Sequence, residues 1–128
     1  MNDSLDYVKF VEEIGMTEEQ VQRLVHQHDD LIMTRRCFEY AVLKPSPIHG
    51  VGLFASRFIP KATPFAPARV NNCRCVAGRW MNHTINPNCQ FVPINSDLET
   101  VALRDILEGE ELTVNYRNIL EIRRKTGI

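Results

Sequence analysis

Between residues 37 and 117 the chain contains only short apolar runs, each interrupted by turn-forming residues. "CFEYAVLK", "GVGLFAS" and "QFVPI" are separated by glycine, proline or asparagine, and "LETVALRDI" and "EGEELTVNY" follow the turn signals Asn95-Ser96-Asp97 and Glu108-Gly109. Runs of this length, with apolar and polar residues in alternation, are typical of strands. The sequence therefore predicts a mainly β, α+β fold, with short strands and few helices over residues 37–117.

Residues 1–36 differ, because their apolar residues recur at helical spacing. Ser4 can cap a first helix that ends at Gly15, and Thr17-Glu18-Glu19-Gln20 is a capping-box pattern that opens a second helix. The apolar stripes are Leu5, Val8, Val11 and Ile14 in the first helix, and Val21, Leu24, Val25, His28, Leu31 and Ile32 in the second. Because such a hairpin is too small to be stable alone, we expect it to pack on the strands or against a second copy in a homodimer.

Composition narrows the classes of protein. The 128 residues are 44% hydrophobic and 24% charged with a formal net charge of −1, which suits one globular domain and gives no indication of a nucleic-acid or membrane partner. No apolar run is long enough to span a bilayer, and "MNDSLDYVKF" lacks a signal-peptide pattern. We therefore expect a cytoplasmic rather than a secreted protein, with a reducing environment.

Four cysteines leave two interpretations open, namely a zinc site and buried thiols. Cys73 and Cys75 are separated by one residue, which is tighter than the usual spacing of zinc ligands, and Cys89 follows without a paired histidine or cysteine. With Cys37, these residues fit free thiols of a reducing compartment better. The sequence predicts no metal site.

Three stretches combine glycine or turn residues with polar groups. Gly50-Val51-Gly52 precedes a strand, and glycine there permits a tight turn or a close approach of the backbone to a ligand. "RWMNHTINPNC" places the polar Asn82-His83 pair directly after the apolar Trp80 and Met81. "GEELTVNY" ends a predicted strand at Tyr116. Taken singly, these stretches also fit a plain turn, asparagine caps and a buried tyrosine.

In this order, the three stretches resemble the SET domain, the fold of one large class of protein-lysine methyltransferases. The signatures stand here as Gly50-Val51-Gly52, as Arg79-Trp80-Met81-Asn82-His83-Thr84-Ile85-Asn86-Pro87-Asn88 and as Gly109-Glu110-Glu111-Leu112-Thr113-Val114-Asn115-Tyr116. The resemblance covers about residues 40–117. It implies a SET-type fold of short curved sheets with a C-terminal pseudoknot, divided as 1–36 hairpin, 37–117 SET domain and 118–128 C-terminal tail.

The resemblance also implies an activity and its residues. Family members transfer methyl groups from S-adenosylmethionine to the side chain of a lysine in a protein substrate. The cofactor-binding residues would be Gly50, Val51, Gly52, Leu53, Asn82 and His83, with the Asn82 side chain on the methionine part and the His83 backbone at the adenine. Tyr116 would be the catalytic residue, and Phe91, Val114 and Trp80 would contact the substrate. No general base is implied, since burial lowers the pKa of the target lysine.

The chain departs from the family pattern at several places. The segment between Gly52 and Asn82 is short, and Ile85 replaces a cysteine of members that carry a post-SET zinc cluster. The compact size resembles virus-encoded or bacterial members, which would place a virus-encoded protein inside its host cell. The N-terminal hairpin or a second subunit is the candidate to close the substrate channel. Two alternatives stay open, namely a catalytically inactive SET-like binding or regulatory module and an oligomeric scaffold built through the helices.

Overall fold

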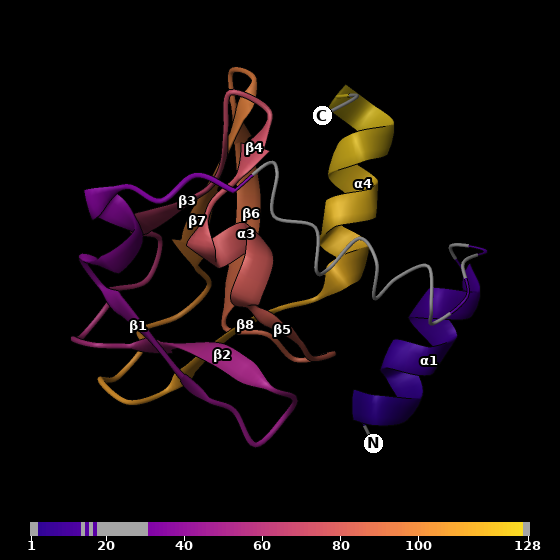
Figure 1. Cartoon of the computed structure of the whole chain (residues 1–128), viewed down its shortest axis with the longest axis horizontal. Helices are drawn as coiled ribbons and strands as arrows, with labels where there is room; N and C mark the ends of the chain where they lie inside the picture. Colours follow the sequence, from indigo (N-terminus) through magenta and orange to yellow (C-terminus); the bar gives the residue numbers. More distant parts are fainter. Residues whose placement is uncertain (1–2, 14, 16, 18–30, 127–128) are drawn as a thin grey trace.

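The computed structural model describes residues 3–13, 15, 17 and 31–126, and short strands dominate this part of the chain (Figure 1). The first sheet has the strand order β1-β2-β8-β5, with bounds Ala41–Pro45, Val51–Ala55, Glu111–Val114 and Asn82–His83. The second has the order β4-β3-β7-β6, with bounds Cys73–Arg74, Pro64–Val70, Asp97–Ala102 and Cys89–Ile94. The mainly β architecture with few helices is confirmed.

Four of the predicted strands form two antiparallel hairpins. β1 and β2 are antiparallel from Ala41 opposite Ala55 to Pro45 opposite Val51. Their turn is closed by the Ser46 N–H, which donates to the Gly50 carbonyl at 2.8 Å, and Gly50 takes a φ of +48°. β6 and β7 pair up to Ile94 opposite Asp97, and Asn95 in the turn between them has a φ of +57°. Glycine and asparagine adopt this left-handed region more easily than other residues, so these turn signals were specific.

The start of the strand region differs from the prediction. "CFEYAVLK" was expected to be a single strand, but Arg35–Phe38 form the 3-10 helix η1 and β1 begins only at Ala41. Thr34 caps η1: its carbonyl accepts the Cys37 N–H at 3.1 Å, and its own N–H donates to the Cys37 sulfur at 3.4 Å. Cys37 is fully buried whereas Phe38 is 43% exposed. The cap at Thr34 therefore favours a helical turn at Arg35–Phe38 over the strand that the alternating sequence predicts.

The N-terminal helix α1, Asp3–Glu13, was predicted, but the residues that it buries were not. Asp6, Phe10 and Val11 are buried, whereas Val8 is 52% exposed, so the predicted apolar stripe was wrong in part. Ser4 lies inside the helix rather than before it. Gly15 follows the helix end with a φ of +70°. The predicted second helix falls on residues 18–30, which lie outside the described residues.

Two further helices were missed. α3, Val76–Trp80, packs on β3, and the space of a Cβ at Gly78 is taken by the Ala68 carbonyl oxygen, 2.2 Å away. α4, Tyr116–Thr126, occupies most of the segment expected to be a tail. α1 and α4 lie on the same side of the sheets (Figure 1). No helix in the described ranges is long and apolar enough to cross a membrane.

Both sheets contribute to a single core. β7 shows the period of two directly, since Leu98, Thr100 and Ala102 are buried and the residues between them are not. The largest fully buried apolar side chains come from β2, β3, β8 and the segments beside them: Phe65, Leu53, Ile59, Ile106, Leu112, Val76 and Val114. Because β2 and β8 are antiparallel neighbours in this core, the segment that precedes β2 is held close to the segment that follows β8.

Candidate active site

A parallel strand pair forms the centre of the site. β5 pairs with β8 so that Asn82 lies opposite Thr113 and His83 opposite Val114. Asn88, which follows β5, ties this segment to β8: its Oδ1 accepts the Thr113 N–H at 2.9 Å, and its Nδ2 donates to the Glu111 carbonyl at 2.8 Å. This asparagine therefore acts as a structural tie. The arrangement brings the Asn82-His83 pair beside Tyr116, which follows β8 at the start of α4.

A polar cluster surrounds the Asn82 amide, which is only 8% exposed. Asn82 Nδ2 donates to Glu111 Oε2 at 2.9 Å, to Ser46 Oγ at 3.0 Å and to the His49 carbonyl at 3.1 Å. Ser46 Oγ in turn donates to both carboxylate oxygens of Glu111, each 2.8 Å away. A carboxylate and a hydroxyl side by side form an acceptor-rich site, which suits a positively charged group.

Gly52 makes this cluster possible. A Cβ at this position would lie 2.4 Å from Glu111 Oε2, 3.0 Å from Ser46 Cβ and 3.1 Å from Asn82 Nδ2. Gly52 is thus required by the close approach of three side chains. Its neighbour Leu53 is fully buried in the core, whereas Val51 is 46% exposed. A ligand over this turn would therefore meet the backbone and Val51 rather than the Leu53 side chain.

Tyr116 is held at two points. Its hydroxyl donates to the Met81 carbonyl at 3.0 Å, and its N–H donates to His83 Nδ1 at 3.0 Å. The His83 and Tyr116 rings lie 5.0 Å apart between centroids. Burial, the largest effect, raises the pKa of the Tyr116 hydroxyl above its usual range. The phenol is therefore neutral at physiological pH and cannot serve as a base.

Helix α1 covers His83 and Tyr116, a contact that sequence reasoning did not identify residue by residue. The Phe10 ring stacks on His83 with centroids 6.0 Å apart and an interplanar angle of 22°, and the Tyr7 ring meets Tyr116 edge-on at 6.2 Å. Asp6 Oδ2 lies 2.6 Å from His83 Nε2 and 2.9 Å from Arg117 Nη1. The signal in the sequence was weak: Asp6 and Phe10 are four residues apart and so share a helix face.

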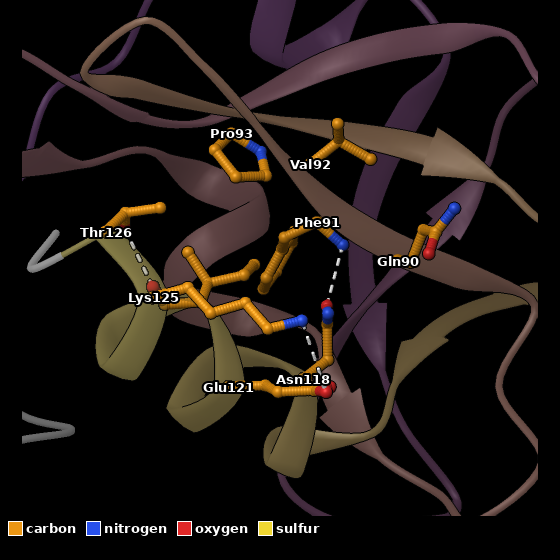
Figure 2. A pocket seen from close by; sticks show the side chains of 9 residues that line it. Gln90, Phe91, Val92, Pro93, Asn118, Glu121, Lys125 and Thr126 are labelled. Atoms are coloured by element: carbon orange, nitrogen blue, oxygen red, sulfur yellow. Dashed lines mark hydrogen bonds and ion pairs between the residues drawn. The ribbon is translucent and has the colours of Figure 1, made fainter.

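The predicted substrate residues lie in different places. Val114 is buried opposite His83, Trp80 is half-buried at the end of α3, and Met81 after it is buried. Phe91 belongs to the second sheet and lines a cavity of about 310 Å³ between β6 and α4 (Figure 2). The Phe91 N–H donates to Asn118 Oδ1 at 2.9 Å, and Tyr116 and His83 are absent from the lining of this cavity. A contact between Phe91 and the target lysine stays a prediction.

All four cysteines are free thiols, with Cys37, Cys75 and Cys89 buried and Cys73 half-buried. Burial raises the pKa of the Cys75 and Cys89 thiols to about 12. Within the described ranges, no group of three or more His, Cys, Asp or Glu side chains is placed to hold a metal ion.

Comparison with known families gives one match. Residues 67–117, which include the Asn82-His83 turn, β8 and Tyr116, match the model of the SET domain. Among curated proteins, none matches this chain. A crystal structure of a Plasmodium falciparum protein described as a candidate histone methyltransferase is similar at 18% identity and a TM-score of 0.49, over 60% of this chain and 92% of that one.

Proposed function

We propose that this protein is a SET-domain methyltransferase that uses S-adenosylmethionine to methylate a lysine side chain in a protein substrate. One observation carries the proposal: the parallel pairing of β5 with β8 holds the Asn82-His83 pair beside Tyr116, next to the Gly50–Gly52 turn. These are the three stretches that carry the family resemblance, and they come from distant parts of the chain.

The polar cluster fits the cofactor. S-adenosylmethionine supplies an electrophilic methyl group on a sulfonium, and its methionine part carries an α-ammonium group. The Glu111 carboxylate and the Ser46 hydroxyl are acceptors for such a group, and the Asn82 amide is held between them. Gly50, Val51, Gly52 and Leu53 would contribute through the backbone of the turn, and His83 through its backbone in β5.

Tyr116 would act by orientation. Because its hydroxyl hydrogen is directed to the Met81 carbonyl, the oxygen lone pairs are left to accept an N–H of the target amine. Such a bond would turn the nitrogen lone pair away from Tyr116 and toward the methyl group. A free lysine has a pKa of about 10.4, and burial beside a sulfonium lowers it, so the amine can react in its neutral form. Positioning then supplies most of the rate enhancement.

α1 would form one wall of this centre. The segment between Gly52 and Asn82 is too short to supply the wall that the family resemblance implies, and Tyr7 and Phe10 already cover His83 and Tyr116 with aromatic surface. An aromatic wall excludes water and so favours the neutral amine. Closure by α1 requires no second subunit, and a homodimer stays a prediction, as does a location in the cytoplasm.

The same contact favours one alternative, a SET-like regulatory module without activity. If α1 is never displaced, the rings of Tyr7 and Phe10 deny a cofactor access to His83. Cofactor binding separates the two functions, since a permanently covered site binds none. A scaffold that needs no cofactor predicts the same negative result.

A labelling experiment tests the proposed activity. The protein is incubated with methyl-labelled S-adenosylmethionine and a protein extract of its source, and methylated lysines are identified by mass spectrometry. Tyr116→Phe removes one hydroxyl that orients the amine and should lower the label by at least about tenfold while cofactor affinity is kept. Equal labelling by the wild type and Tyr116→Phe would contradict the role of Tyr116, and a wild type that labels no lysine and binds no cofactor would favour the regulatory module or the scaffold.

A further inference from the structure

A chain of contacts connects α1 to Tyr116 through His83. Asp6 Oδ2 lies 2.6 Å from His83 Nε2, and His83 Nδ1 lies 3.0 Å from the Tyr116 backbone nitrogen. Asp6 is 6% exposed and His83 4% exposed, so water does not compete well for either contact. The two contacts use both ring nitrogens, and the first of them joins residues 77 positions apart in the sequence.

The partners of the ring determine its tautomer. The Tyr116 N–H can only donate, so Nδ1 must carry a lone pair. The Asp6 carboxylate can only accept while it is ionised, so the ring proton must lie on Nε2. Asp6 therefore selects the tautomer in which Nδ1 can hold the Tyr116 backbone. A proton on Nδ1 would instead face the Tyr116 N–H and break that bond.

We propose that Asp6 is a positioning residue for methyl transfer, which acts through the His83 tautomer on the backbone of Tyr116. The inference rests on the proposed function of Tyr116 and adds to the site a residue from α1, outside the segment that matches the SET domain. It assigns α1 a part in the geometry of the active centre, beyond its part as a wall.

The surroundings keep Asp6 ionised. Arg117 Nη1 donates to the same Oδ2 at 2.9 Å, and this bond, followed by the one from His83, holds the pKa of the Asp6 carboxyl below its usual range. Arg117 also donates to both carboxylate oxygens of Glu13, at 3.1 and 3.2 Å. Glu13 thus anchors the same helix to the same arginine without touching His83, which provides a matched control.

The test combines nuclear magnetic resonance with kinetics. The full chain is labelled with 15N-histidine, the His83 signals are assigned with His83→Gln, and the tautomer is read from the two ring nitrogen shifts. The wild type should show the proton on Nε2. Asp6→Asn can donate its amide to Nε2, so we expect a shift of the proton to Nδ1. With it we expect a fall in kcat on the order of tenfold or more, with the cofactor Kd unchanged.

Two control variants distinguish an effect of the His83 tautomer from a general loss of structure or activity. Glu13→Gln should keep both the tautomer and kcat, and Tyr116→Phe should keep the tautomer while it loses turnover. A wild type with the proton on Nδ1, an Asp6→Asn variant with unchanged tautomer or kcat, or an equal loss in Glu13→Gln would each overturn the inference. If Asp6→Asn fails to fold, the wild-type tautomer and the kinetics of Glu13→Gln still test the proposed role of Asp6. Full turnover in Tyr116→Phe would instead refute the role of Tyr116 on which the inference rests, whatever the tautomer.

Discussion

Replacing Gly52 with alanine tests whether the polar cluster beside Asn82 is as tightly built as its distances indicate. The new Cβ would lie 2.4 Å from Glu111 Oε2, so the carboxylate must move. That movement breaks the bonds that Oε2 accepts from Ser46 at 2.8 Å and from Asn82 at 2.9 Å. A hydrogen bond to a charged group contributes about 1.5–3 kcal/mol, and water can replace part of it at this half-buried side chain.

We therefore expect Gly52→Ala to lower the free energy of unfolding by about 2–4 kcal/mol. At about 4 °C per kcal/mol for a chain of this length, the melting temperature should fall by roughly 8–16 °C. Urea denaturation followed by circular dichroism measures the free energy directly. A change below about 0.5 kcal/mol, the usual range for an uncrowded surface site, would refute the crowding argument.

A double-mutant cycle isolates the cause. If the cost arises from the displaced carboxylate, adding Gly52→Ala to Glu111→Ala should cost at least about 1 kcal/mol less than adding it to the wild type. Gly50→Ala is the matched control, because Gly50 has open space around its missing Cβ but a φ of +48°. It should cost about 1 kcal/mol through backbone strain and should be additive with Glu111→Ala.

The remaining predictions concern acid stability and thiol reactivity. Because Arg117, and after it His83, hold the pKa of Asp6 below its ordinary 3.8, ionised Asp6 stabilises the fold above about pH 4, and this contribution is lost as the pH falls through the depressed pKa. The difference in unfolding free energy between the wild type and Asp6→Asn should therefore shrink as the pH is lowered below about 4, and a constant difference would contradict this. Of the four thiols, half-buried Cys73 should react first with a thiol reagent, and Cys73→Ser should remove the fast phase; unchanged kinetics in that variant would refute it.

The parts of the fold that follow from local chemistry could be predicted from the sequence. The β6–β7 hairpin depended on Asn95-Ser96, and the β1–β2 hairpin on the turn that ends at Gly50. β3 was missed because Pro64 and Pro67 argue against a strand. The structure accommodates both prolines by shifts of register in the pairing with β7, one between Pro64 and Ala66 and one between Pro67 and Arg69.

Long-range contacts explain the other features that the sequence did not predict. The motifs indicated Asn82, His83 and Tyr116, but nothing local reveals that Asp6 pairs with His83 or that Glu111 fills the space over Gly52. α4 was missed because the motif that drew attention ended at Tyr116, although Ile119 and Ile122 recur at helical spacing and pack on the core. Tertiary contacts of this kind are chosen by the whole fold, so a single sequence does not reveal them.

Binding of S-adenosylmethionine tests the central claim most directly. The proposed activity requires this binding, whereas the regulatory module with a permanently covered site and the scaffold without a cofactor both exclude it. Titration calorimetry with the wild-type chain should give a saturable heat with one site per chain, and the cofactor should raise the melting temperature. Asn82→Ala removes the amide that donates to both Glu111 and Ser46 and should weaken binding by at least about tenfold. A wild-type chain that gives no heat and no thermal shift, with either S-adenosylmethionine or its demethylated product, would contradict the account.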